Sequence, residues 1–442
     1  MYWVTAGIFV LGYTMIAFEH TIKIDKAASA ILTAVLTWTA LVLGFDSEAV
    51  HEVREHLGEI AEILFFLLGA MTIVELVDAH EGFKVVTDRI TSRKKVILLW
   101  ILSFIAFFFS AVLDNLTTTI VMVSLVRKLV DDAKERWFMA GMIVVAANAG
   151  GAWSPIGDVT TTMLWIGTQI TTVNIIQELF LPSLVCLLVP LIFLSFRLKG
   201  DFERPAEPEE TGNDAVTDFE RKLIFGMGIS LLLFVPVFKT VTHLPPYMGM
   251  LFGLSILWIT TEIIHGSKNA EDKRPLSIAG VLTRIDTPSV LFFLGILLAV
   301  AALSSGGHLA QLGEFLNANL GNIYAINIAI GLLSAVVDNV PLVAGAMKMY
   351  PLVTPEQLAA AATDQADWLG HFVADGHFWE LLAYCAGTGG SCLIIGSAAG
   401  VAAMALEKID FFWYLRNISL LALMGYLAGA FVYIGEVMMM HY

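Results

Sequence analysis

Long apolar runs, separated by short polar connections, follow one another along most of the chain. They lie near residues 2–18, 27–44, 59–79, 96–129, 137–170, 179–197, 222–240, 246–264, 286–303, 321–350, 378–406 and 411–435. A helix that crosses a bilayer needs about 20 apolar residues. Most of these runs have that length, so the pattern predicts an all-α polytopic membrane protein.

Some of the runs are too long for one helix, and each of these has polar, Gly or Pro residues near its middle. They are 96–129, 137–170, 321–350 and 378–406. Interrupted segments at matching positions of two halves mark the binding site in many transporters. We therefore expect a re-entrant hairpin at 96–129 and 321–350, and a broken helix at 137–170 and 378–406.

The chain divides into two similar halves. Residues 199–221 are rich in charge, Pro and Gly, and predict a cytoplasmic linker between a first membrane repeat (1–198) and a second one (222–442). Ser-Ala-Val-Leu-Asp-Asn at 110–115 matches Ser-Ala-Val-Val-Asp-Asn at 334–339. Paired glycines followed by Ile-Gly also recur at identical spacing. The order is the same in both halves, which indicates an internal duplication.

The basic residues predict the topology. If each half has five spans and one re-entrant hairpin, the odd number of spans inverts the second repeat relative to the first. All Lys and Arg residues then fall on one side of the membrane except Arg54, Lys239 and Lys348. Cytoplasmic loops carry the excess of basic residues, so this side is predicted to be cytoplasmic and both termini to be outside.

Composition narrows the function classes. Of the 442 residues, 57% are hydrophobic and 15% are charged, whereas soluble domains carry about 25% charged residues. The net charge of −15 disfavours nucleic acid as a partner. Cys186, Cys385 and Cys392 lie in apolar runs and predict neither disulfides nor a zinc site. The first run lacks a basic leader region, so we interpret it as the first span.

The candidate chemistry lies in the interrupted runs. Carboxylates at membrane depth are costly and point to function, and the first hairpin carries Asp114 and the second Asp338. Carboxylate, amide and hydroxyl oxygens are hard ligands that suit Na⁺, although each Asp could simply cap a helix. The predicted ion-binding residues are Asp114, Asn115, Thr117, Thr118, Asn148, Ser154, Asp158, Thr160, Thr161, Ser334, Asp338, Asn339, Thr388, Ser391 and Ser397.

Outside these segments, other polar residues have simpler interpretations. Glu75, at the end of the third run, is a candidate for a proton path. His80 and Glu407 are predicted to lie at the membrane interface, His80 in contact with solvent. Residues 351–380 predict a long solvated loop on the outer side.

The two Asp-Asn hairpins, the Gly-rich broken helices and the duplication resemble the ion transporter superfamily. Asp-Asn-Leu-Thr-Thr at 114–118 and Asn-Ala-Gly-Gly-Ala-Trp-Ser-Pro-Ile-Gly-Asp-Val-Thr-Thr at 148–161 resemble the NhaD-type sodium/proton antiporters. The resemblance implies exchange of Na⁺ or Li⁺ for H⁺ in a bacterial inner membrane, a homodimer and an elevator-like transport domain. It implies a Na⁺ site at Asp114, Asn115, Asp338 and Asn339, and no cofactor beyond the transported ion.

The residues suggest how exchange would work. Dicarboxylate carriers of the same superfamily have Ser where this chain has the hairpin Asp, so here the negative charge belongs to the protein. Burial favours the protonated form of a carboxyl, and Na⁺ and H⁺ would then compete for Asp114, Asp158 and Asp338. Two alternatives remain open: an anion or oxyanion permease for arsenite or a carboxylate, and an intramembrane aspartyl protease that pairs Asp114 with Asp158.

Overall fold

The computed structural model describes residues 2–45, 49–90, 92–202 and 216–440. Within this part the regular structure is helical, apart from an isolated bridge between Lys94 and Asp201. Most of the predicted linker, residues 203–215, lies outside the described residues. A helix already begins at Asp218, inside the range that the sequence assigns to the linker.

The first half of the chain contributes ten helices to the described structure. They are α1 (Tyr2–Ala17), α2 (Glu19–Ile22), α3 (Lys26–Phe45), α4 (Ala49–Ala79), α5 (Lys84–Thr87), α6 (Lys95–Leu113), α7 (Asn115–Leu129), α8 (Ala133–Ala152), α9 (Val159–Ile166) and α10 (Thr172–Arg197). Helix α6 ends and α7 begins on either side of Asp114, and α8 and α9 are separated by the Ser-Pro and Gly-Asp residues of the fifth run.

The second half of the chain contains the remaining helices. Its helices in the described chain are α11 (Asp218–Thr242), α12 (Pro246–Ile264), η1 (His265–Ser267), α13 (Ala270–Leu276), α14 (Ile278–Leu282), α15 (Thr287–Ser305), α16 (His308–Leu320), α17 (Ile323–Leu333), α18 (Asn339–Met349), α19 (Pro355–Ala360), α20 (Thr363–Gly370), α21 (His377–Gly389), α22 (Ala398–Glu407), α23 (Phe411–Tyr414), η2 (Leu415–Ser419) and α24 (Leu420–Met440). Helices α17 and α18 meet at the second Asp-Asn pair, and α21 and α22 are separated by a Gly-rich break.

The chain is a multi-pass membrane protein. Among the described residues, 8 helices are long and apolar enough to cross a membrane, and a further pair, α16 and α17, is bent by 117°. Helices α7, α9, α18 and α22 are each too short to cross alone, because the four longest apolar runs each break into two helices at their polar residues.

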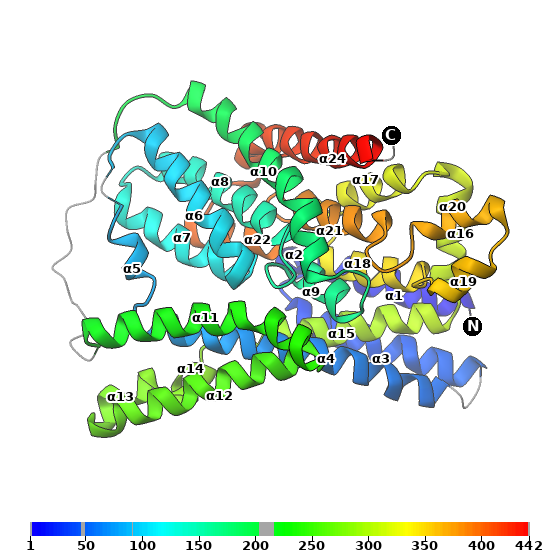
Figure 1. Cartoon of the computed structure of the whole chain (residues 1–442), viewed down its shortest axis with the longest axis horizontal. Coiled ribbons are helices and arrows are strands. Elements are labelled where there is room, and N and C mark those ends of the chain that lie inside the picture. Colours follow the sequence, from blue (N-terminus) through cyan, green and yellow to red (C-terminus); the bar gives the residue numbers. More distant parts are fainter. Residues whose placement is uncertain (1, 46–48, 91, 203–215, 441–442) are drawn as a thin grey trace.

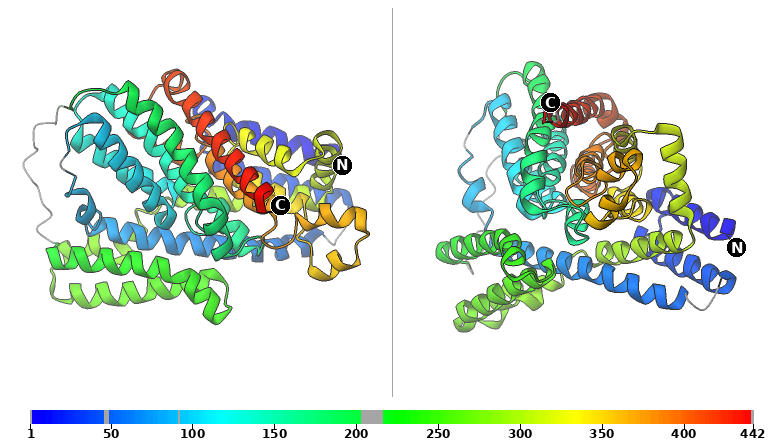
Figure 2. Two further views of the ribbon diagram at one scale, coloured as in Figure 1. Left: turned by 45° about the horizontal axis from the view of Figure 1, so that its top comes forward. Right: turned by 45° about the vertical axis from the view of Figure 1, so that its right-hand side comes forward.

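The helices form two bundles that lie side by side (Figures 1 and 2). One bundle contains α1, α3, α4, α11, α12 and α15, and the other contains α6 to α10, α17, α21, α22 and α24. Helix α18 packs on α15 of the first bundle and on α9 and α21 of the second. The second hairpin therefore lies at the boundary between the bundles.

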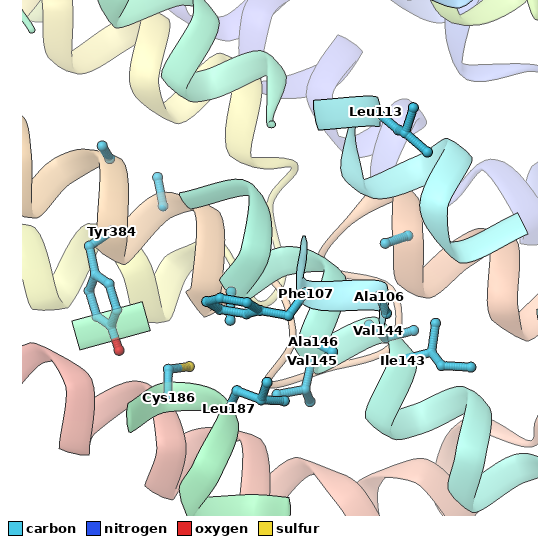
Figure 3. Close-up of a cluster of buried hydrophobic side chains, with 14 of the residues drawn as sticks. Ala106, Phe107, Leu113, Ile143, Val144, Val145, Ala146, Cys186, Leu187 and Tyr384 are labelled. Carbon is cyan, nitrogen blue, oxygen red and sulfur yellow. The ribbon is translucent and has the colours of Figure 1, made fainter. Parts of the chain in front are cut away.

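Small residues let the helices of the second bundle approach closely. Around Phe107, apolar side chains of α6, α8, α10 and α21 form a buried core (Figure 3). A Cβ at Gly150 would lie 2.1 Å from the Phe107 carbonyl oxygen, and one at Gly389 would lie 2.0 Å from that of Gly331. The two halves thus make equivalent close contacts, between α8 and α6 and between α21 and α17.

The structure corrects the prediction for His80. The side chain is fully buried rather than solvated, and its Nε2 lies 3.2 Å from Nε2 of His265, with the two rings stacked. His80 Nδ1 is 2.7 Å from the Leu76 carbonyl oxygen and donates to it, since a carbonyl only accepts. His80 Nε2 is then the acceptor and His265 Nε2 the donor of the contact that joins the ends of α4 and α12.

Candidate ion-binding site

Asp158 lies at the centre of the polar residues and is almost completely buried. It is the N-cap of α9, and its Oδ1 accepts hydrogen bonds from the Thr160 backbone N–H at 2.9 Å and from the Thr160 hydroxyl at 2.8 Å. Its Oδ2 accepts from Nδ2 of Asn115 at 2.6 Å. Nδ2 of Asn339 lies 3.4 Å from both carboxylate oxygens. Asp158 therefore binds amides from both hairpins.

Asn148 connects this carboxylate to the second broken helix. Its Oδ1 accepts from Nδ2 of Asn115 at 3.0 Å, and its Nδ2 donates to the hydroxyls of Ser391 and Ser397 at 2.9 Å each. All of these side chains are at least nine-tenths buried. A continuous hydrogen-bond network thus joins segments of both halves at the two Asp-Asn pairs and the two breaks.

The two hairpin aspartates cap their own helices. Asp114 accepts from the Thr117 backbone N–H and hydroxyl, each at 2.8 Å. Its backbone has φ 88° and ψ 157°, a region populated almost only by glycine, which costs about 1–3 kcal/mol in other residues. Such strain persists only where the surroundings impose it, so the fold forces the Asp114 carboxylate to this position. Asp338 has an ordinary φ and accepts from the Val340 N–H at 3.1 Å.

Other predicted site residues bind the backbone instead of one another. The hydroxyl of Ser154 donates to the Ala111 carbonyl, and that of Ser334 donates to the Ala386 carbonyl. The hydroxyls of Thr161 and Thr388 donate within their own helical segments. Thr118 is buried, and its hydroxyl has no hydrogen-bond partner among the described residues. The bonds of Ser154 and Ser334 join segments that lie far apart in the sequence and so support the breaks around the network.

A cavity of about 520 Å³ leads to this network. Thr117, Asp338 and Ser397 line it at the network, and Glu75, Asp78 and Arg284 line it elsewhere. Glu75 Oε1 lies 3.7 Å from Nη1 of Arg284. Because the C-terminal end of α4 and the start of α15 adjoin the basic connections of the chain, the cavity opens toward that end. Glu75 therefore lies on the wall of the open cavity and outside the hydrogen-bond network around Asp158.

A second, smaller cavity of about 330 Å³ lies between α4, α9, α15 and α18, toward the other end of the molecule. Nζ of Lys348, on α18, pairs with Glu59 on α4 at 2.9 Å. Nζ of Lys239, on α11, donates to the Trp165 carbonyl oxygen at the end of α9 at 2.8 Å. Lys348 and Lys239 thus connect the two bundles at this end. Both are among the three bases that the sequence predicts on the outer side.

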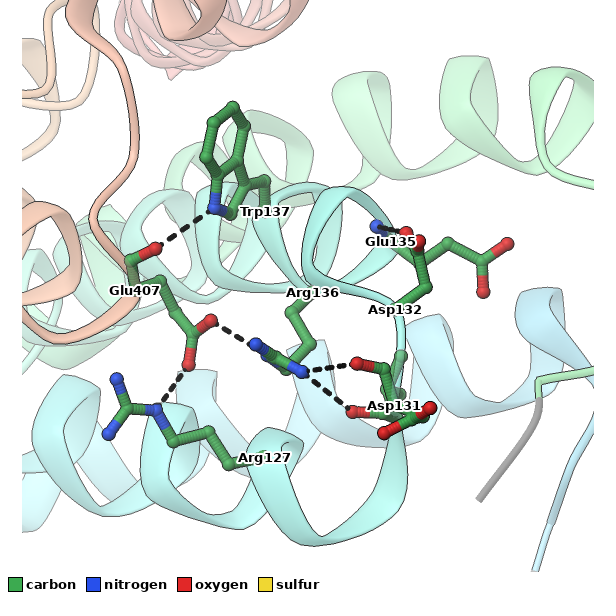
Figure 4. A network of polar contacts seen from close by, with 8 residues as sticks. Arg127, Asp131, Asp132, Glu135, Arg136, Trp137 and Glu407 are labelled. Carbon is green, nitrogen blue, oxygen red and sulfur yellow. Dashed lines mark hydrogen bonds and ion pairs between the residues drawn. The ribbon is translucent and has the colours of Figure 1, made fainter. Parts of the chain in front are cut away.

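Glu407, at the end of α22, binds residues of α7 and α8 (Figure 4). Its Oε1 lies 2.5 Å from Nε of Arg127 and its Oε2 lies 2.8 Å from Nε of Arg136, while Trp137 donates to its carbonyl oxygen. The Glu407 side chain is 1% exposed, so it is buried against the protein. The carboxylate joins α7, α8 and α22, and no local sequence pattern relates these distant residues.

Comparisons with known proteins match the chain to transporters. Residues 13–368 match the family model described as a citrate transporter. The chain is 49% identical to sodium/proton antiporter 1 of Arabidopsis thaliana, over 97% of this chain and 71% of the relative. It is 32% identical to the Na⁺/H⁺ antiporter NhaD of Vibrio cholerae, over 96% of this chain and 89% of the relative.

This chain belongs to the NhaD-type sodium/proton antiporter family. Sodium/proton antiporter 2 of Arabidopsis thaliana, 46% identical, matches over 97% of this chain and 98% of its own length. The relatives are transporters, so this member of the NhaD-type family is not an enzyme. The family assignment confirms the resemblance that the hairpin and broken-helix motifs indicate.

Proposed function

We propose that the protein exchanges Na⁺ or Li⁺ for H⁺ by alternating access, with the cation and protons competing for Asp114, Asp158 and Asp338. The observation that carries the proposal is the position of Asp158, a buried carboxylate bound by amides of both hairpins. A carboxylate in such surroundings needs either a cation or a proton to balance its charge. The names of the relatives support the choice of Na⁺ and H⁺.

The architecture that we propose has two inverted repeats, each with five spans, one re-entrant hairpin and one broken helix. In support, Asp114 and Asp338 are the N-caps of α7 and α18, and the starts of α1 and α11 lie at opposite ends of Figure 1. The end with the basic connections would be cytoplasmic and both termini outside. Movement of the second bundle against the first would provide elevator-like access, in a homodimer.

The relatives come from bacteria and from a plant. The bacterial inner membrane is therefore a proposal that rests on the resemblance alone. Surrounding lipid is the expected partner for the apolar outer faces of the bundles.

The family description names citrate, which makes a carboxylate carrier the alternative to test. Among the described residues that line the larger cavity, the bases are Lys26 and Arg284. Arg284 faces Glu75, and Lys26 lies over the Phe292 ring at 4.6 Å from its centroid. An anion at the hairpin tips would instead meet Asp114, Asp158 and Asp338, which disfavours this alternative.

The experiment is cation-dependent proton flux in everted membrane vesicles. A proton gradient is set up, Na⁺, Li⁺, K⁺ or citrate is added, and a pH-sensitive dye reports proton movement. We expect Na⁺ and Li⁺ to dissipate the gradient in the parent protein and not in Asp158→Asn. Asp410→Asn is the matched control, because Asp410 also caps a helix but lies outside the network.

Two results would contradict the proposal. Normal exchange by Asp114→Asn or Asp338→Asn would exclude the shared-site mechanism. Citrate uptake by the parent without cation-dependent proton flux would favour the carboxylate carrier.

A further inference from the structure

The two hairpin tips differ in the donors that they offer their aspartates. Three residues after Asp114, Thr117 supplies both a backbone N–H and a hydroxyl to the carboxylate, each at 2.8 Å. Three residues after Asp338 stands Pro341, which has neither a backbone N–H nor a hydroxyl. The second hairpin therefore lacks the two donors that hold the first aspartate in place.

Tyr13 of α1 reaches the tip of the second hairpin from the other bundle. The Asp338 backbone N–H donates to the Tyr13 hydroxyl oxygen at 3.1 Å. A phenol both accepts and donates, so its own hydrogen can still bind an oxygen. Both residues line the larger cavity, which leads to the site. The ring stacks on Phe9, one turn earlier in α1, with the ring centroids 6.0 Å apart.

We propose that Tyr13 is a positioning residue for Asp338: by accepting from the Asp338 backbone N–H it holds the tip, whose carboxylate lacks the two donors that Thr117 gives to Asp114. This inference rests on the proposed exchange function. Helix α1 belongs to the first bundle, whereas the hairpin packs on both. The hydrogen bond therefore exists only while the hairpin tip is docked on α1, as it is here with the larger cavity leading to the site. Tyr13 thus favours cation binding from the end to which that cavity opens.

The experiment compares Tyr13→Phe with Tyr2→Phe on the same helix, whose hydroxyl binds Gln311 away from the site at 2.7 Å. The KM for Na⁺ and the maximal rate are measured in everted vesicles at several pH values. Loss of one hydrogen bond should raise the KM of Tyr13→Phe by about 3- to 10-fold. The maximal rate should change far less, and Tyr2→Phe should behave like the parent.

A rescue variant separates positioning from a merely structural role. Pro341→Thr recreates the Thr117 arrangement, with an N–H and a hydroxyl three residues after the aspartate. In the Tyr13→Phe background it should return the KM most of the way to the parent value. Failure of this rescue, with normal amounts of folded protein, would contradict the positioning role.

Other outcomes separate this inference from the proposed function. If the parent exchanges Na⁺ for H⁺ and Tyr13→Phe keeps its KM within about twofold, the role of Tyr13 is disproved and the exchange function stands. If the parent shows no exchange, the proposed function fails, and calorimetric titration of the purified full chain with Na⁺ tests Tyr13 directly. Absent binding by the parent, or an unchanged Kd in Tyr13→Phe, would then overturn the inference.

Discussion

At the scale of single residues, the three aspartates have unequal surroundings. Asp158 receives donors from three other residues, Asp114 receives them from Thr117, and Asp338 receives them from Val340 and contacts Tyr13. The sequence predicted all three carboxylates, because an Asp at membrane depth stands out against apolar neighbours. It could not predict that the amides of Asn115 and Asn339 point at Asp158, since that depends on how distant breaks meet. Tyr13 was missed because a Tyr near a helix end looks like an ordinary interface residue.

Asn148 gives a test of the network itself. Asn148→Ala removes the contacts to Asn115, Ser391 and Ser397 and frees the Asn115 amide from its second acceptor. Because each such bond contributes about 0.5–1.5 kcal/mol, we expect the KM for Na⁺ to rise more than tenfold. Asn319→Ala is the control, since Asn319 is exposed and binds only its own helix. Equal KM values for the two variants in the vesicle assay would show that the network does not shape the site.

At the scale of helices, an apolar run predicted the position of its helix well where the run and the helix have the same boundaries. The run 246–264 coincides with α12. Helix α4, however, begins at Ala49 rather than near residue 59, because its first turns are polar and extend beyond the apolar run. The predicted outer loop contains α19, α20 and the start of α21, where Glu380 is buried and paired with His377. Short polar helices of this kind have no apolar period from which to predict them.

The close helix contacts should tolerate no added side chain. Gly150→Ala and Gly389→Ala would each place a methyl group about 2 Å from a backbone carbonyl oxygen, so we expect a loss of about 1–3 kcal/mol or more from overpacking. Gly58→Ala on α4 meets nothing within 4 Å and should gain up to about 1 kcal/mol of helix propensity. Thermal unfolding of the purified proteins in detergent measures the difference. Similar Tm values for all three variants would contradict the packing.

The ion pairs of Glu407 with Arg127 and Arg136, here called the Glu407 clamp, should stabilise the helices that frame the site. Glu407→Gln leaves Arg127 and Arg136 without their shared carboxylate. Because both arginines are partly exposed, we expect a loss of about 1–3 kcal/mol from the two charge-assisted hydrogen bonds. Glu262→Gln removes the exposed pair with Lys273, where about 0–1 kcal/mol is expected. A Tm of Glu407→Gln equal to that of Glu262→Gln would show that the clamp does not contribute to stability.

The His80–His265 contact should weaken in acid. Burial lowers the pKa of His80, and burial together with the neighbouring His80 lowers the pKa of His265 from 6.5 to about 4. The unfolded chain therefore binds more protons than the folded one between these pH values, so stability falls as the pH drops from about 6.5 towards 4. His265→Asn cannot titrate and should lose less Tm between pH 7 and 5 than the parent. An identical pH dependence for both proteins would exclude this contribution.

At the scale of the whole molecule, the position of the larger cavity determines from which end the site is accessible. Its lining joins the hairpin tips to one end of α1, α4 and α15. At the opposite end of the bundle boundary, Lys348 pairs with Glu59 and Lys239 donates to the Trp165 carbonyl oxygen. If the basic end is cytoplasmic, the site is accessible from the cytoplasm in this structure. The sequence pattern cannot predict which end of the site is open, because one sequence must fold into every state of a transport cycle.

Single-cysteine labelling tests this accessibility. The native cysteines are all buried and should not react, whereas Ile120 lies on the cavity wall and is 41% exposed. A membrane-impermeant maleimide should label Ile120→Cys in everted vesicles, where the cytoplasmic face is outside, and much more slowly in right-side-out vesicles, because the thiol must meet water to react. Leu113→Cys, which replaces a buried side chain, should stay unlabelled in both. Faster labelling of Ile120→Cys in right-side-out vesicles would place the opening on the other side of the membrane, and with it reverse the orientation of the protein.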